Sequence, residues 1–142
     1  MPVQWDMKTP IETTPGYSLQ PRLRVFAGRQ MVIGWGKVML LQLVQETGSI
    51  AEAARSMGMS YNHAWGLIRL MNASFKEPLV EATRGGKGKG GATVTKAGIK
   101  VLSTYQEMTE KCVEATKPQW RTLKAMLRPA DEIPPHPSDG GE

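Results

Sequence analysis

The sequence has one cysteine, Cys112, and only two histidines, His63 and His136, which lie far apart along the chain. A single cysteine excludes an intramolecular disulfide and a cysteine-based zinc site, and two distant histidines do not make a metal site. No apolar run approaches the roughly 18 residues of a membrane-spanning helix, and the N-terminus lacks the apolar core of a signal peptide. We therefore expect a cytoplasmic protein without a metal or a membrane segment.

Groupings of catalytic side chains are missing as well. No serine–histidine–aspartate, cysteine–histidine or paired-carboxylate arrangement stands out, and the acidic residues are scattered. Nucleophilic or acid–base catalysis needs such groupings. We expect no catalytic residue, no cofactor and no enzymatic activity.

The segment from Arg84 to Lys100 contains no acidic residue. It holds five cations, namely Arg84, Lys87, Lys89, Lys96 and Lys100. A length of 142 residues suits one domain with tails. The chain carries a net charge of +5, with a pI near 9.5. Since many soluble proteins are mildly basic, the clustering is more informative than the total, and it favours a polyanionic partner.

Two short helical patterns lie between Gly48 and Phe75, separated by a tight turn at Gly58. The first begins with a capping box, in which the Ser49 hydroxyl accepts from the Glu52 amide while the Glu52 side chain reaches back. Ser60 can cap the second pattern. The second pattern has a regular apolar stripe of Ala64, Leu67, Ile68, Met71 and Phe75. Together they predict a helix-turn-helix.

Other elements surround this pair. A short strand or hairpin is expected around Gly28, followed by an amphipathic helix that stops near Gly48. After Pro78, the segments 79–83 and 92–94 are typical of two strands around the loop RGGKGKGG. Thr95 can then cap a long helix, which Pro118 interrupts, and a short helix can follow. The prediction is a mainly α fold with a small β-hairpin, a winged helix-turn-helix with a long C-terminal dimerisation helix.

We expect three regions along the chain. Residues 1–20 are rich in proline and lack periodicity, which indicates a flexible arm. Residues 21–117 form the winged helix-turn-helix domain, and residues 118–142 hold the short helix and a disordered, proline-rich, acidic tail.

The outward face of the second helix pattern carries Tyr61, Asn62, Trp65, Gly66 and Arg69. Asparagine pairs with adenine, arginine with guanine or phosphate, and an aromatic ring can cover a thymine methyl group. Core packing is an equal alternative for Trp65, and His63 fits an ordinary surface or capping role. A glycine within a helix costs about 1 kcal/mol relative to alanine, so we expect another helix or a DNA backbone to approach closely at Gly66.

The loop RGGKGKGG combines three cations with five glycines. Glycines let its backbone approach a phosphate or a narrow groove, although a merely solvated hairpin tip has the same composition. A nucleotide-binding P-loop is excluded, because neither Gly-Lys pair precedes serine or threonine and a strand follows.

A heptad-like seam is expected on the long helix, where apolar residues are spaced four, three and four apart: Val101, Tyr105, Met108 and Cys112. Part of this seam can pack on the first helix of the same chain. Its distal half, Met108 and Cys112, should meet the same helix of a second copy.

These stretches resemble a known family. Over residues 20–117 the chain is similar to the N-terminal DNA-binding domain of the molybdate-responsive ModE regulators, and more loosely to the LysR-type winged helix. The matching stretches are GSIAEAARSMGMSYNHAWGLIRLMN, LVEATRGGKGKGGATVT and KAGIKVL. The resemblance implies a homodimer, held largely by the long last helix, on palindromic double-stranded operator DNA. It places recognition on residues 60–69, starting at Ser60, and the wing role on residues 84–89.

One feature of that family is not expected here. Its molybdate-binding part is a C-terminal pair of small β-barrels, and the residues after 117 are too few and too rich in proline to form them, so the molybdate response is not carried over. Three possibilities stay open for an effector: none, a partner protein, or a small ligand at the dimer interface. Two alternatives stay open: a winged helix that docks another protein, and a small binder of oxyanions such as molybdate that uses the glycine- and lysine-rich loop as an anion nest.

Overall fold

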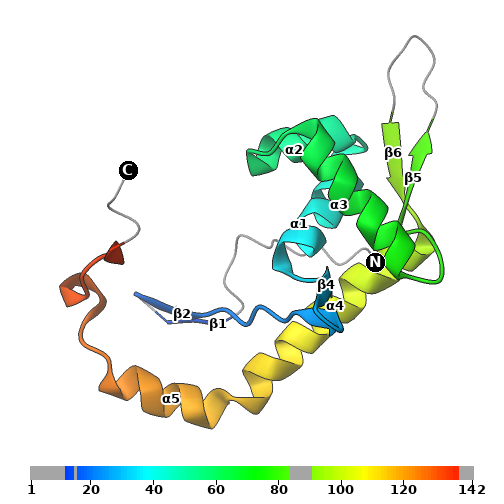
Figure 1. Cartoon of the computed structure of the whole chain (residues 1–142). Coiled ribbons are helices and arrows are strands. Elements are labelled where there is room, and N and C mark those ends of the chain that lie inside the picture. Colours follow the sequence, from blue (N-terminus) through cyan, green and yellow to red (C-terminus); the bar gives the residue numbers. More distant parts are fainter. Residues whose placement is uncertain (1–11, 15, 84–90, 138–142) are drawn as a thin grey trace. The chain divides into compact units, whose positions relative to one another are not determined.

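The computed structural model (Figure 1) describes residues 12–14, 16–83 and 91–137. They fall into two compact units, the first with residues 22–83 and 91–108 and the second with residues 12–14, 16–21 and 109–137. The elements of the first unit are β3 (Val25–Ala27), β4 (Gln30–Ile33), α1 (Trp35–Thr47), α2 (Ile50–Met57), α3 (Tyr61–Ser74), β5 (Val80–Thr83), β6 (Gly91–Val94) and the first part of α4 (Lys96–Ala115).

Helices α1, α2 and α3 pack together around one apolar core. The core side chains of these helices are all under 9% exposed: Val38, Leu40, Leu41, Val44, Ile50, Ala53, Ala54, Ala64, Ile68 and Met71. Each large aliphatic side chain contributes about 1.5–3 kcal/mol by leaving water. The small side chains Ala53 and Ala54 let α2 lie close to its neighbours. This packing fixes the orientation of α3, which carries the candidate site.

The hairpin β5–β6 lies beside the three helices, with β6 in contact with α1 (Figure 1). Its antiparallel register pairs Val80 with Val94 and Thr83 with Gly91. Side chains of alternate strand residues share one face, so Ala92 and Val94 lie together on the buried face of β6 while Thr93 is exposed. A backbone hydrogen bond from the Ala92 N–H to the Gly48 carbonyl oxygen, 2.9 Å long, ties β6 to the end of α1. The two predicted strands are confirmed, and residues 84–90 between them lie outside the described residues.

The hairpin β3–β4 confirms the prediction around Gly28, which has the left-handed φ of 62° that favours glycine at a tight turn. The buried Lys37 side chain of α1 donates to the Met31 carbonyl oxygen, and burial lowers the pKa of its ammonium group. Helix α4 then begins where the Thr95 hydroxyl accepts from the Gly98 N–H at 3.1 Å, which confirms the predicted cap.

The second unit corrects two expectations. Residues 12–19 were expected within a flexible arm, but β1 (Glu12–Thr14) and β2 (Tyr17–Leu19) form an antiparallel hairpin. Gly16 adopts a φ of 88° between the strands, a conformation that glycine adopts freely. The tail that follows the short helix within residues 118–142 was expected to be disordered, but a short 3₁₀ turn covers Ala130–Glu132. The Tyr17 hydroxyl donates to the Arg128 carbonyl oxygen at 2.6 Å, a contact between distant segments that no local pattern predicts.

The short helix expected after Pro118 is confirmed as α5 (Lys117–Met126), with the proline in its first turn. Within the described ranges, no helix is long and apolar enough to cross a membrane. The same residues contain no cluster of three or more histidine, cysteine, aspartate or glutamate side chains that could hold a metal ion.

Candidate nucleic-acid interface

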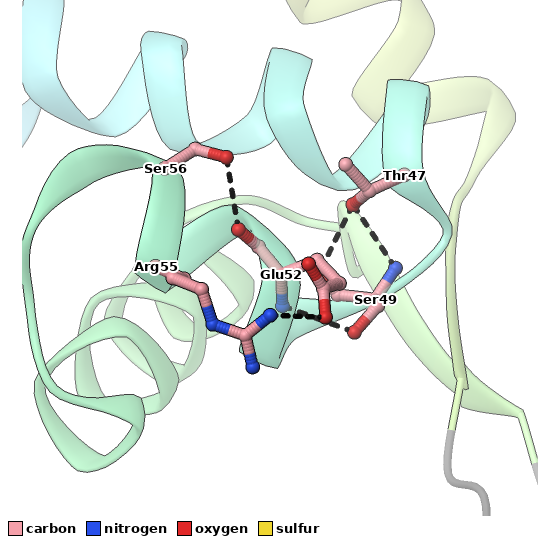
Figure 2. Close-up of polar contacts among 5 residues, drawn as sticks. All are labelled: Thr47, Ser49, Glu52, Arg55 and Ser56. Carbon is pink, nitrogen blue, oxygen red and sulfur yellow. Dashed lines mark hydrogen bonds and ion pairs between the residues drawn. The ribbon is translucent and has the colours of Figure 1, made fainter.

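The corner between α1 and α2 is held by side-chain hydrogen bonds (Figure 2). Ser49 accepts from the Glu52 N–H at 3.1 Å, which confirms half of the predicted capping box. The other half is wrong. The Ser49 N–H bonds to the Thr47 hydroxyl at 3.2 Å, while the Glu52 carboxylate pairs with Arg55 at 2.7 Å. The hydroxyls of Thr47 and Ser49 thus accept from N–H groups that a helix start leaves unpaired, and α2 begins after the cap at Ser49.

The turn between α2 and α3 is set by Gly58 and Ser60. Gly58 has a φ of 68°, and its N–H donates to the Arg55 carbonyl oxygen at 3.1 Å. The Met59 N–H donates to the Ala54 carbonyl oxygen at 3.0 Å, which completes a glycine-ended helix stop. Ser60 accepts from the His63 N–H at 3.1 Å. These contacts confirm the predicted turn and cap, and they start α3 at a defined residue.

Helix α3 presents two distinct faces. Ala64, Ile68 and Met71 are fully buried, whereas Leu67 and Phe75, also expected in the stripe, are only partly buried. The opposite face is open to solvent: Ser60, Tyr61, Asn62, His63 and Arg69 are exposed, and Trp65 is partly exposed. The structure therefore brings the predicted recognition residues onto one accessible surface. Their role in DNA binding stays a prediction.

Asn72 is a residue of this region that sequence reasoning missed. Its side-chain oxygen accepts from the Leu79 N–H at 2.8 Å and from the Val80 N–H at 3.2 Å, and its nitrogen donates to the Val80 carbonyl oxygen at 3.0 Å. These bonds join α3 directly to the first strand of the hairpin. A polar residue next to the apolar stripe at Met71 is a signal for a structural hydrogen bond. The sequence does not show which groups it bonds, because Leu79 and Val80 come close only in the folded chain.

The predicted wing cations cannot be placed in the same way. Arg84, Lys87 and Lys89 lie outside the described residues. The strands on either side of them are described, and the exposed Lys96 and Lys100 of the same basic segment lie on the first turns of α4. The loop's contact with a polyanion stays a prediction.

The residues of the predicted dimer seam on α4 differ in exposure, since Tyr105 is buried and Met108 lies at the surface. Tyr105 is only 4% exposed, and its hydroxyl donates to the Leu23 carbonyl oxygen of the same chain at 2.8 Å. Burial raises the pKa of this phenol. Val101 and Cys112 are partly exposed, and Met108 is 44% exposed. A dimer contact through this seam stays a prediction, and Tyr105 also serves the fold of its own chain.

An open groove of about 780 Å³ is lined by three residues of this seam, Val101, Tyr105 and Met108. Its lining is largely apolar and includes Val25, Phe75, Val101 and Met108, while Lys76, Lys96 and Lys100 also border it. The groove leaves apolar side chains of the first unit in contact with solvent, which is unfavourable for an isolated chain.

The fold of the first unit defines its class. Two helices joined by a glycine turn, with an exposed second helix and an adjoining two-stranded hairpin, form a winged helix-turn-helix. Residues 35–99 match the family described as bacterial regulatory helix-turn-helix protein, lysR family.

Curated relatives narrow this class. The chain is 44% identical over 94 residues to the transcriptional regulator ModE of Yersinia pestis, which covers 64% of this chain and 36% of that protein. It is 36% identical over 74 residues to the DNA-binding transcriptional dual regulator ModE of Escherichia coli (strain K12), which covers 52% of this chain and 28% of that protein. It is 44% identical over 73 residues to the molybdenum-pterin-binding protein MopB of Rhodobacter capsulatus, which covers 51% of this chain and 27% of that protein.

The chain therefore contains a ModE-like helix-turn-helix domain. The matched segments span between 27% and 36% of the length of these three relatives.

Proposed function

We propose that this chain is a cytoplasmic, sequence-specific DNA-binding regulator of transcription, not an enzyme, and that it acts as a homodimer on a palindromic operator. The observation that carries the proposal is that α3 has one buried apolar face and one exposed polar face. Ala64, Ile68 and Met71 fix the helix in the core, while Asn62 and Arg69 face solvent. The ModE-like relatives, which are named as transcriptional regulators, support the same function.

Helix α3 is the element that would enter the major groove. Asn62, in its first turn, would read a base edge, and Arg69, two turns in, would reach a base or a phosphate. The start of α3 at Ser60 would also favour a phosphate, because the free N–H groups of a helix N-terminus attract anions. The core contacts hold the helix backbone in advance, so binding would order mainly side chains.

The hairpin would contact the DNA backbone beside the groove. Arg84, Lys87 and Lys89 would bind phosphates and position the domain without reading the sequence. The Asn72 bonds to Leu79 and Val80 tie the first strand of the hairpin to α3, which supports a fixed geometry between the two contacts.

A second copy would cover the groove beside α4. The exposed Met108 and the apolar lining around it supply the surface for this contact, and Cys112 follows one turn later on the same helix. A two-fold axis through such a contact would repeat α3 on the DNA about 34–36 Å away, which is one helical turn.

Selection of bound duplexes from a random library tests this function. The full chain should enrich one sequence with two inverted half-sites whose centres lie about one helical turn apart. The affinity for this operator, measured by fluorescence anisotropy at a fixed salt concentration, should exceed that for random duplex by about 10³-fold or more. Salt-sensitive binding without any enriched sequence would contradict the proposal.

A further inference from the structure

The exposed glycine at the centre of α3, Gly66, is not required by the fold. Apart from its two chain neighbours and the nearby backbone of α3 itself, a Cβ atom built at Gly66 would meet no heavy atom of the described residues within 4 Å, and the φ of Gly66 is not in the left-handed region. This rules out a close neighbouring helix, one of the two expectations for this position. Glycine inside a helix is unfavourable relative to alanine, so its presence calls for a reason outside the folded chain.

Other glycines of the domain show what a structural requirement looks like. Gly58 has a positive φ of 68° at the turn before α3. Gly98 is buried, and a Cβ there would collide with the Leu79 carbonyl oxygen and lie 2.6 Å from a methyl group of Val94. Gly66 has neither property, although it lies in the same compact unit.

The position of Gly66 on α3 indicates what approaches it. Asn62 is four residues earlier and Arg69 is three residues later, so both lie on the face of Gly66. All three are exposed. The major groove, about 12 Å wide, accepts a helix about 10–12 Å in diameter with little spare room. A side chain at the middle of the inserted face would hold the helix away from the bases.

We propose that Gly66 is a specificity-determining residue, at which the bare backbone of α3 contacts the base edges of the major groove and lets Asn62 reach them, with Arg69 beside it at a base or a phosphate. This inference rests on the proposed DNA-binding function. The glycine acts by the absence of a side chain, so its effect is confined to the close, sequence-specific complex. Loose binding through phosphates does not bring α3 to the same depth.

The test compares Gly66→Ala and Gly66→Leu with Gly36→Ala and Gly36→Leu in the full chain. Gly36 is a matched control, because it is also exposed and helical, and a Cβ built there also meets nothing within 4 Å among the described residues. Alanine and leucine are both good helix formers. Circular dichroism and thermal melting should show that all four variants fold, with melting temperatures equal to or above that of the parent protein.

Anisotropy with the selected operator and with random duplex then measures binding. Gly66→Ala should weaken operator binding about tenfold, and Gly66→Leu about a hundredfold or more, which matches the loss of one or more base contacts. Binding to random duplex should change less than about twofold, because it depends on phosphates. The Gly36 variants should bind both duplexes as the parent protein does.

Each contrary outcome has a distinct meaning. Operator binding by Gly66→Leu equal to that of the parent protein would overturn the role of Gly66 while leaving the regulator function intact. A lower melting temperature in the Gly66 variants, or an equal loss in the Gly36 variants, would also overturn it, since the glycine would then serve the fold. A parent protein that does not distinguish the selected duplex from random DNA would overturn the proposed function, and this inference with it.

Discussion

The side-chain amide of Asn72 and the peptide group of Val80 hydrogen-bond in both directions. The Asn72 nitrogen donates to the Val80 carbonyl oxygen at 3.0 Å, and the Asn72 oxygen accepts from the Val80 N–H at 3.2 Å. This pair joins α3 to the start of the hairpin. The two elements proposed to contact DNA therefore share a polar connection in addition to their apolar core.

Asn72→Ala should lower the free energy of unfolding by about 1–3 kcal/mol, because it leaves the partly buried backbone groups of Leu79 and Val80 without their partner. Urea unfolding followed by circular dichroism measures the change. Asn62→Ala removes an asparagine from the exposed face of the same helix, and it should shift the stability by less than about 0.5 kcal/mol. Equal stability of Asn72→Ala and the parent protein would refute the bridging role.

Asn62→Ala and Arg69→Ala should affect binding instead of stability. Loss of a base contact should cost about 1–3 kcal/mol on the operator and little on random DNA. Asn62 is the stronger candidate for a base contact, because it lies in the first turn of α3, whereas Arg69 lies two turns in and can reach a phosphate. Anisotropy with both duplexes separates the two cases. Equal losses on operator and random DNA would assign a residue to phosphate positioning.

Lys87→Ala combined with Lys89→Ala should weaken binding to all duplexes by a similar factor, because phosphate contacts carry little sequence information. If a dimer makes about 6–8 phosphate contacts, the logarithm of affinity should fall with the logarithm of salt concentration with a slope of roughly −5 to −7. The double variant should flatten this slope. Lys111→Ala with Lys124→Ala, on α4 and α5, removes the same charge and should leave the slope nearly unchanged. An unchanged slope in the loop variant would contradict the wing role.

Met108→Glu should give a folded monomer with much weaker operator binding, because a charge at the proposed interface opposes its burial against a second copy. Sedimentation velocity at micromolar concentration measures the oligomeric state. Ile99→Glu is the matched control: Ile99 is 45% exposed on α4, and its nine-residue separation from Met108 puts it roughly on the opposite side of the helix. A monomeric parent protein, or a Met108→Glu variant that still forms dimers, would refute the interface.

Tyr105→Phe should lower the stability at neutral pH by about 0.5–1.5 kcal/mol, because it removes the hydrogen bond to the Leu23 carbonyl oxygen. It should also change the alkaline limb of the stability profile. Burial raises the pKa of Tyr105 above its ordinary value of 10.0, so the unfolded chain loses this proton first. The stabilisation is complete below about pH 10 and is lost as the pH rises through the folded-state pKa.

Urea titrations from pH 8 upward, on Tyr105→Phe and the parent protein, isolate this contribution. Lys37 has the opposite sign, since its lowered pKa in the folded chain makes stability rise with pH below its ordinary value of 10.5. Lys37 is present in both proteins, so the difference between the two profiles reports Tyr105. A difference that stays constant through the alkaline range would contradict a titrating, buried Tyr105.

The sequence alone determined the features that depend on groups a few residues apart. The caps at Ser49, Ser60 and Thr95 and the glycine stop at Gly58 follow from hydrogen bonds within one or two turns, and all were predictable. The 3.6-residue period also separated the buried Ala64, Ile68 and Met71 from the exposed Asn62 and Arg69 before any tertiary contact was known.

Tertiary structure decided the features whose partners are remote in sequence. Tyr105 and Leu23 are 82 positions apart, and Asn72 meets Val80 only because a helix and a strand pack together. The apolar seam on α4 was compatible with the core or with a second copy, and packing placed Tyr105 in the core. Gly66 was equally ambiguous until the space around it proved open. Local patterns specify hydrogen bonds along the backbone, whereas the burial of one side chain depends on every element that packs against it.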